Sequence, residues 1–188
     1  MKSKIAVAVL GVGALVVVGG LWAVGTYNRL VGLNEGATAA WAQVENVLQR
    51  RFDLVPNLVN TVKGYAKHEA SVLEEVTRLR SQWGEAKTPG DKMSAAQGLE
   101  GALSRLMVVI EKYPDLKANE NFLKLQDELA GTENRIAVER RRFNEAAKTY
   151  NVALRLFPGN LVARWSGFAP RGYFEAAPQA QTAPVVAF

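Results

Sequence analysis

The chain has 188 residues, a formal net charge of +5 and 48% hydrophobic residues, enough apolar material for one domain with a buried core. It contains no cysteine, which excludes disulfides, zinc–thiolate sites, iron–sulfur clusters, thiol catalysis and a lipidated cysteine anchor. Basic and acidic residues nearly balance after the N-terminus, and no basic-plus-aromatic motif of a nucleic-acid-binding module occurs, so no nucleic acid is expected as a partner.

Residues 5–25 form an uncharged stretch, and about 20 apolar residues suffice to cross a bilayer. We therefore expect residues 1–26 to be an N-terminal membrane anchor that makes the lipid bilayer a partner of the protein. Trp22 and Tyr27 stand where aromatic side chains are enriched at the membrane interface. We also expect the anchor helix to run without a break into the helix that follows it.

The flanks of this stretch bear on its processing and orientation. The apolar core of a signal peptide is shorter, about 7–15 residues, which favours a retained anchor; Ala23 and Gly25 form a weak cleavage site, so a removed signal is the alternative. Lys2 and Lys4 precede the stretch. The positive-inside rule then predicts a single-pass membrane protein with the N-terminus in the cytoplasm and the larger domain on the outer side.

Residues 27–158 have a helical period of apolar residues and no strand alternation of useful length. Turn signals divide them into four amphipathic segments, at "RRFDLVPN", "KTPGD", "KYPDLKAN" and "FPGN". Short connections make consecutive helices antiparallel neighbours. The predicted fold is therefore all-α, an antiparallel up-down four-helix bundle on an N-terminal transmembrane helix.

The last of the four segments has the clearest pattern, a coiled-coil-like heptad that starts at the N-cap Asn119 and ends at Pro158. Its apolar positions predict a core stripe, and the aromatic members need no cofactor to explain them. The residues that recur every seven positions are Phe122, Leu129, Ile136, Phe143, Tyr150 and Phe157.

The first connection is expected at residues 50–53, with Asp53 capping the second helix and Pro56 in its first turn, where a missing N–H costs little. Leu58, Val62 and Tyr65 would then enter the core. Beyond the bundle, residues 159–175 are an aromatic segment expected to pack on it. Residues 176–188 are an Ala/Pro/Gln-rich tail with the composition of a disordered segment.

Several long motifs carry a family likeness: "YNRLV", "RRFDLVPNLVNTVKGYAKHE", "YPDLKANENFLKLQDELAGTENRIAVERRRFNEAAKTYN" and "FPGNLVA". With the apolar anchor before them, they resemble the LemA family of bacterial membrane proteins over nearly the whole chain. The resemblance implies a mostly four-helix antiparallel bundle, an envelope location and no established enzymatic activity. Together with the predicted orientation, it leads us to expect a protein of the bacterial cytoplasmic (inner) membrane with the bundle on the outer, periplasmic side. One branch of that family resembles proteins needed to form magnetosome membranes, which suggests membrane organisation.

Three charged motifs are candidate sites. His68 and Glu69 stand together, but His68 is the only histidine and no Glu-x-x-His pair exists, so a structural role is favoured over catalysis or metal binding. Arg50 and Arg51 form an anion site or complement the helix dipoles, and we favour the second. The arginines of "ERRRF", residues 139–143, either bind acidic lipid or, as we favour, make ion pairs. We expect no catalytic residues, no metal site and no cofactor.

Two sets of polar residues remain. Glu69, Thr132 and Glu139 occupy nominal seam positions and form either polar layers that fix register or partner choice, or the solvated edge of a drifting seam. Core packing does not explain a second set, which we interpret as the contact surface. Its members are Asn57, Asn60, Lys63, Gly64 and Lys67. Gly64 either permits close approach of another helix or is a tolerated surface glycine.

These features predict a protein that is not an enzyme and acts by binding. The main hypothesis is an envelope protein that forms a homo-oligomer and serves as a scaffold or membrane organiser, with other envelope membrane proteins as further candidate partners. The alternative is a sensory or ligand-binding four-helix bundle that signals through a membrane partner.

Overall fold

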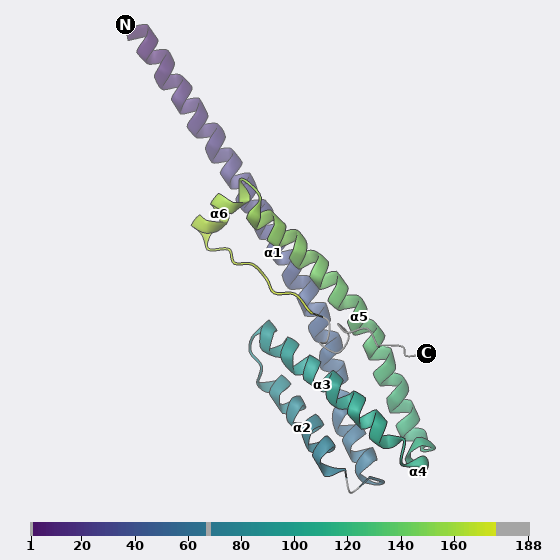
Figure 1. Cartoon of the computed structure of the whole chain (residues 1–188). Coiled ribbons are helices and arrows are strands. Elements are labelled where there is room, and N and C mark those ends of the chain that lie inside the picture. Colours follow the sequence, from purple (N-terminus) through teal and green to yellow (C-terminus); the bar gives the residue numbers. More distant parts are fainter. Residues whose placement is uncertain (1, 67–68, 176–188) are drawn as a thin grey trace, which may run out of the picture. The chain divides into compact units, whose positions relative to one another are not determined.

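The computed structural model describes residues 2–66 and 69–175, with side chains from Leu10 onward. In these residues it contains six helices and no strand, so the described protein is all-α (Figure 1). Lys67, His68 and the predicted tail 176–188 lie outside the described residues. The helices are α1 (Lys2–Lys63), α2 (Ala70–Glu85), α3 (Pro89–Ile110), α4 (Pro114–Lys117), α5 (Glu120–Arg155) and α6 (Gly159–Ser166).

Helix α1 continues from the apolar N-terminal stretch into the next helical segment, as the absence of strong helix breakers predicted. The predicted hairpin at residues 50–53 is wrong. Asp53 caps no helix, and Pro56 lies inside α1 rather than in the first turn of a second helix. The chain leaves α1 only after Lys63, and α2 begins at Ala70.

A buried stripe explains why α1 passes through Pro56. Its members follow one another at intervals of three and four residues on both sides of the proline: Val44, Leu48, Phe52, Val55, Val59 and Val62. A proline inside a helix costs about 3 kcal/mol, because it removes a hydrogen bond and clashes with the preceding turn. Each buried Val, Leu or Phe side chain contributes about 1.5–3 kcal/mol, so the continuous stripe outweighs that cost.

Local capping sets the starts of two later helices. The hydroxyl of Thr88 accepts a hydrogen bond from the backbone N–H of Asp91 at 3.1 Å, and Pro89 occupies the first position of α3. Asn119 caps α5 as predicted, since its side-chain oxygen accepts a hydrogen bond from the Phe122 N–H at 3.0 Å. These two caps lie at turn signals that the sequence displays.

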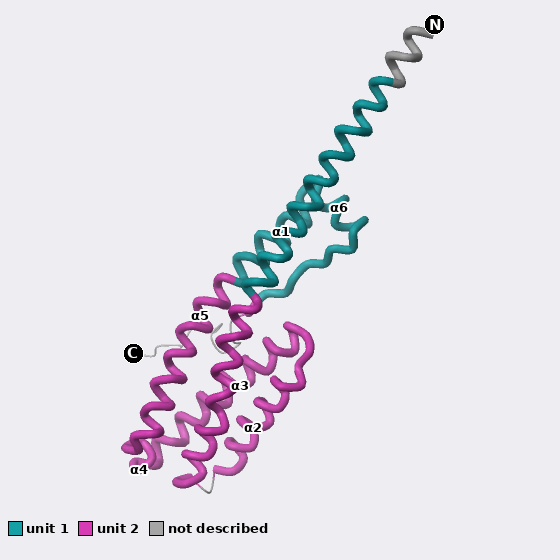
Figure 2. Tube along the Cα trace, turned by 180° about the vertical axis from the view of Figure 1, so that it is seen from behind, with its two compact units in different colours: residues 1–40, 143–173 teal, residues 41–142, 174–188 magenta. Residues whose placement is uncertain are grey.

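Helices α1 and α5 each contribute residues to two compact units (Figure 2). The first unit contains residues 1–40 and 143–173. Its core cluster comprises four buried residues, Leu30, Tyr150, Leu154 and Ala163. The hydroxyl of Tyr150 donates a hydrogen bond to the carbonyl of Ala169 at 3.1 Å, which ties the segment after α6 to α5.

Among the described residues, the second unit contains 41–66, 69–142 and 174–175. Within it α2 and α3 pack as a hairpin, and the ring of Phe52 stacks on that of Trp83 at 4.6 Å between centroids. Trp41 likewise stacks on Phe174 at 5.7 Å. Tyr65 is 42% exposed and not in the core as predicted, because α1 ends two residues before it and the helical stripe stops there.

The heptad of α5 is confirmed over most of its length. Phe122, Leu129 and Ile136 are buried, and so are Phe143 and Tyr150. The final member is an exception: Phe157 is 72% exposed, because α5 ends at Arg155 and the chain no longer follows the helical stripe.

A glycine begins the short helix that follows. A Cβ atom at Gly159 would lie 2.1 Å from the carbonyl oxygen of Ala153, so only glycine fits this position. Gly167 ends α6 with φ +74°, in the left-handed region that glycine adopts without strain. The two glycines therefore bracket α6 and fix where it begins and ends.

Candidate interaction surfaces

Part of the predicted contact surface lines an open groove in the second unit. Asn57, Asn60 and Thr61 of α1 form one side, and Asn121 and Lys124 of α5, together with Leu125, form the other. The groove has a volume of about 380 Å³. The Thr61 hydroxyl donates its hydrogen bond to the backbone carbonyl of Asn57 at 2.8 Å. The side chains of Asn57 and Asn60 are exposed beside the groove. Amide groups and one ammonium group suit a polar or acidic partner.

Lys63 belongs to a different cavity, of about 620 Å³, where α1 ends beside α2. Its lining combines apolar Ala66, Ala70 and Leu73 with polar side chains such as Thr77. Gly64 follows the end of α1, and a Cβ atom there would lie in ordinary contact with the Thr61 carbonyl oxygen at 3.5 Å. Packing against the described residues therefore does not require glycine at this position, and close approach of a helix from another copy stays a prediction.

Each residue of the predicted polar seam has a local partner of its own. The carboxylate of Glu69 accepts a hydrogen bond from the Tyr113 hydroxyl at 3.2 Å. The buried Thr132 hydroxyl donates to the carbonyl of Leu129 in its own helix at 2.8 Å. Glu139 pairs with Arg142 at 2.7 Å, one turn further along α5.

The Tyr113–Glu69 contact also affects the phenol. Desolvation raises the pKa of Tyr113 above its ordinary value, and the hydrogen bond to Glu69 and the negative charge of Glu69 act in the same direction. Tyr113 therefore stays protonated at neutral pH and keeps its hydrogen to donate. This contact lies at the α1–α2 connection and joins it to the start of α4.

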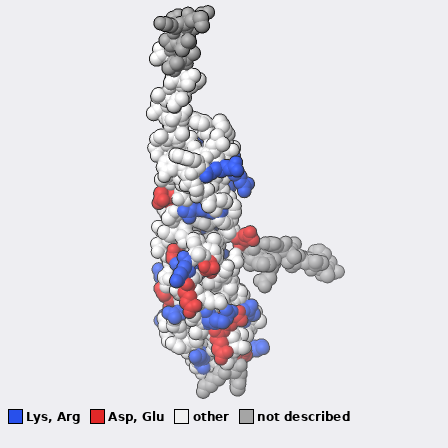
Figure 3. Space-filling view, turned by 90° about the vertical axis from the view of Figure 1, so that its left-hand side faces the viewer, with Lys and Arg blue, Asp and Glu red and all other residues white. Residues whose placement is uncertain are grey.

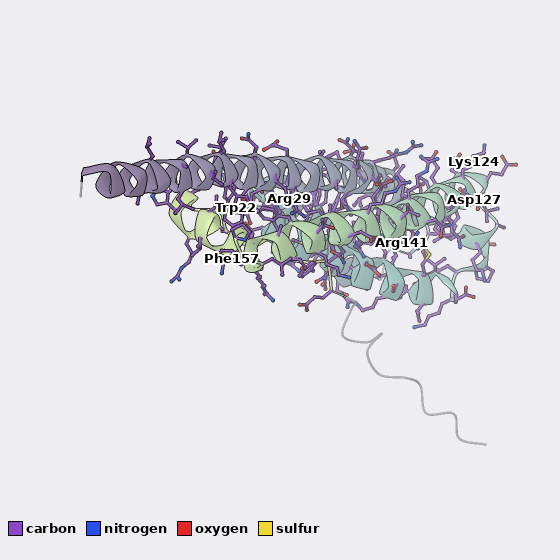
Figure 4. The ribbon with its side chains drawn as sticks, turned by 90° about the horizontal axis from the view of Figure 1, so that it is seen from above. Trp22, Arg29, Lys124, Asp127, Arg141 and Phe157 are labelled. Atoms are coloured by element: carbon purple, nitrogen blue, oxygen red, sulfur yellow. The ribbon has the colours of Figure 1, made fainter. Side chains whose placement is uncertain are left out.

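The arginines serve mainly as ion-pair partners. Arg51 is 7% exposed in the C-terminal part of α1, and its guanidinium donates to the carboxylate of Glu133 on α5. The anion-site and helix-dipole interpretations of Arg51 both assumed that it lies at the corner of a helical hairpin. Neither interpretation therefore predicted a buried position inside α1. Arg140 of the "ERRRF" motif pairs with Glu100 of α3 at 3.1 Å, while Arg141 is exposed (Figure 4).

The N-terminal part of α1 is exposed and apolar. In the residues described from Leu10 onward, α1 is the one helix long and apolar enough to cross a membrane by length and composition, and none of its most apolar window is buried. Figure 3 shows no charged side chain on this N-terminal part of the described surface. The Trp22 ring lies 5.5 Å from that of Phe157 (Figure 4). The Tyr27 ring lies 5.6 Å from that of Phe168.

Comparison with known proteins identifies the family of this chain. The model of the LemA family matches residues 40–188. The chain belongs to the LemA family. Within the described residues of this LemA protein, no group of three or more His, Cys, Asp or Glu side chains is placed to hold a metal ion.

Relatives of this LemA chain include the magnetosome protein MamQ of Magnetospirillum gryphiswaldense, which is 30% identical over 85% of this chain and 68% of its own length. Magnetosome protein MamQ 1 of Paramagnetospirillum magneticum matches to the same extent. Protein LemA of Metamycoplasma hominis is 26% identical over 75% of this chain and 65% of its own length.

Proposed function

We propose that this LemA protein is a single-pass membrane protein that acts as a self-associating scaffold of the bacterial envelope and not as an enzyme. The observation that carries the proposal is the exposure of the apolar part of α1, which continues into a helix whose later residues build a packed core. An apolar helix face without a protein partner is stable in lipid and costly in water. One helix thus serves both as the anchor and as a member of an up-down four-helix arrangement.

The proposed topology places the N-terminus in the cytoplasm and the helical domain on the periplasmic side of the inner membrane. Lys2 and Lys4 support it through the positive-inside rule. A reporter active only in the cytoplasm, fused to the C-terminus, would then be inactive, and a reporter active only in the periplasm would be active. The opposite pair of results would reverse the topology.

Self-association is proposed to use the groove between Asn57, Asn60 and Lys124. Its polar side chains are exposed, and packing within the chain does not require them. The resemblance to magnetosome proteins supports a role in organising a membrane. Such a role needs several copies to act together, which agrees with the proposed self-association.

The test is the mass of the full chain extracted in a mild detergent. We expect a discrete oligomer, which Lys124→Glu shifts toward monomer while the control Lys148→Glu, an equally exposed lysine of α5, leaves its mass unchanged. A wild-type monomer would contradict self-association. An oligomer that both variants leave intact would exclude the groove as its interface.

The cavity beside Lys63 favours a second candidate function, ligand binding by the helical domain. Its volume of about 620 Å³ falls in the usual range of small-molecule sites, about 300–1,000 Å³. Native mass spectrometry of the purified full chain would detect a small molecule retained by wild type and lost from Ala70→Trp, which fills the cavity from an exposed position. A ligand-free monomeric wild type would count against this sensor.

A further inference from the structure

Helix α6 presents an apolar face that no part of the described chain covers. Its other face packs inward through Gly159 and Ala163, which are buried. Leu161 is 57% exposed and Trp165 is 91% exposed, and just before the helix Leu156 and Phe157 are exposed as well. Large apolar side chains clustered on a surface in this way mark an interaction site rather than random exposure.

This face lies beside the end of the predicted membrane-spanning stretch, within the first unit. Ala23, Val24 and Tyr27 of α1 line a wholly apolar cavity of about 290 Å³ together with Val162 and Trp165 of α6. Figure 1 shows α6 against α1 at this point. The exposed face of α6 is therefore continuous with the apolar surface of α1.

An aromatic contact holds the connection between α5 and α6 beside Trp22 of α1. The ring of Phe157 lies 5.5 Å from that of Trp22, and Figure 4 shows the two side chains pointing toward one another. Trp22 belongs to the uncharged stretch of α1, and the first charged residue after it is Arg29. Phe157 and α6 therefore lie at the depth where the predicted interfacial aromatics stand.

The charges around α6 have a single sign. No acidic residue occurs in residues 146–174, and Arg155 and Arg164 directly precede the exposed Leu156 and Trp165 in the sequence. On α1 the first acidic residue is Glu35. Apolar and aromatic residues on one face, with arginines at its edge, are typical of helices that lie in the plane of a membrane and bind anionic lipid.

We propose that α6 and the residues before it form an interfacial membrane-binding element. In this arrangement Leu156, Phe157, Leu161 and Trp165 insert into the same leaflet where α1 emerges, and the arginines contact anionic phospholipid headgroups. The proposal rests on the membrane anchor of the proposed function. Its partner is the bilayer, because the face continues the surface of the helix that crosses it.

The absence of cysteine allows a direct test by site-specific labelling. The full-length Leu161→Cys variant, carrying an environment-sensitive fluorophore, is reconstituted in vesicles of phosphatidylcholine and phosphatidylglycerol. Val108→Cys of α3 is the matched control, since Val108 is also an exposed aliphatic residue. We expect blue-shifted emission at position 161, quenching by spin-labelled lipid, and an iodide quenching constant several-fold smaller than at position 108.

Two results would overturn the proposal. Equal quenching by iodide at positions 161 and 108, without quenching by lipid, would place α6 in water. Protection of position 161 from both quenchers would assign the face to a second copy or another protein. Trp165→Cys repeats the measurement at an independent site, and far-ultraviolet circular dichroism verifies that each variant retains its helices.

A third label separates this proposal from the anchor itself. Val16→Cys lies in the apolar part of α1 and is quenched by lipid if the anchor spans the bilayer. Lipid quenching at position 16 without quenching at position 161 would refute the α6 proposal and leave the anchor standing. Loss of lipid quenching at both positions would refute the anchor as well.

Discussion

The two units hold their helices together with different chemistry. All seven ion pairs found among the described residues lie in the second unit, between residues 45 and 142. Aromatic contacts occur in both units, but the first unit uses neutral acceptors, such as the Asn34 side-chain oxygen that accepts from Arg171 at 2.9 Å. Burial raises the pKa of its Tyr150 phenol, partly offset by the positive charge of Arg171, so this hydroxyl also remains a neutral donor.

The difference fits the surroundings proposed for each unit. Ion pairs are tolerated where water or a close counter-charge stabilises both partners, and they are costly beside lipid. Aromatic rings and amide groups carry no net charge and suit the membrane interface. The ion pairs of the second unit therefore suit a water-exposed helical domain, and the neutral contacts of the first unit suit the position beside the bilayer that we propose for α6.

The largest expected effect contrasts two identical substitutions, one in each unit. Phe52 is fully buried against Trp83, so Phe52→Ala should lower the free energy of unfolding by about 3–5 kcal/mol. Phe157 is mostly exposed, and Phe157→Ala should cost less than about 1.5 kcal/mol, the range of one aromatic contact. Urea unfolding of the full chain in detergent, followed by circular dichroism, measures both. Similar losses would show that the first unit buries Phe157 after all.

The second prediction concerns the buried charge of the second unit. Glu133→Gln leaves the buried Arg51 guanidinium without its counter-charge. Because the Glu133 side chain is 39% exposed, the loss should lower the free energy of unfolding by about 1.5–3 kcal/mol. Glu111→Gln removes an exposed pair with Lys117 and should cost less than about 1 kcal/mol. The same unfolding measurement compares the two. Equal small effects would mean that water solvates Arg51.

The third prediction concerns the neutral network of the first unit. The buried Asn151 side chain accepts from the Arg171 N–H at 2.9 Å and donates to the Arg171 carbonyl at 2.8 Å. Asn151→Ala leaves the N–H and the carbonyl of Arg171 without these partners, which should lower the free energy of unfolding by about 1–3 kcal/mol. Trypsin should then cleave after Arg171 faster than in wild type, as mass spectrometry would show. The control Asn121→Ala, at an exposed asparagine, should leave the rate unchanged, and an unchanged rate in both would refute the role of Asn151.

Much of the fold could be predicted from short-range signals. Thr88 with Pro89 and the cap Asn119 mark the starts of α3 and α5 where the structure has them. The boundary between α1 and α2 could not be predicted in this way. Pro56 looks like a helix start when only its neighbours are considered, and the burial that carries α1 through it comes from residues of other helices.

The candidate surfaces were predictable to a lesser degree. The pattern of Asn57 and Asn60 indicated an exposed polar face, but the other side of their groove comes from Asn121 and Lys124, more than 60 positions away in the sequence. Glu133 as the partner of Arg51 was missed for the same reason. Of the predicted polar seam, Thr132 and Glu139 have partners within one turn of α5, and Glu69 has a partner at the α1–α2 connection. A heptad register alone does not reveal these partners.

The smallest expected effect tests helix packing inside the second unit. Beyond the backbone of its own helix, Gly131 of α5 has no neighbouring atom within 4 Å of where a Cβ would stand, so Gly131→Ala should stabilise the protein by up to about 1 kcal/mol through helix propensity. At Gly98 of α3 a Cβ would lie 2.7 Å from a methyl carbon of Leu79 on α2. Leu79 has to shift, so Gly98→Ala should gain clearly less or become destabilising. An equal gain from both substitutions, measured by urea unfolding, would show that α2 and α3 pack more loosely than their contact at Gly98 implies.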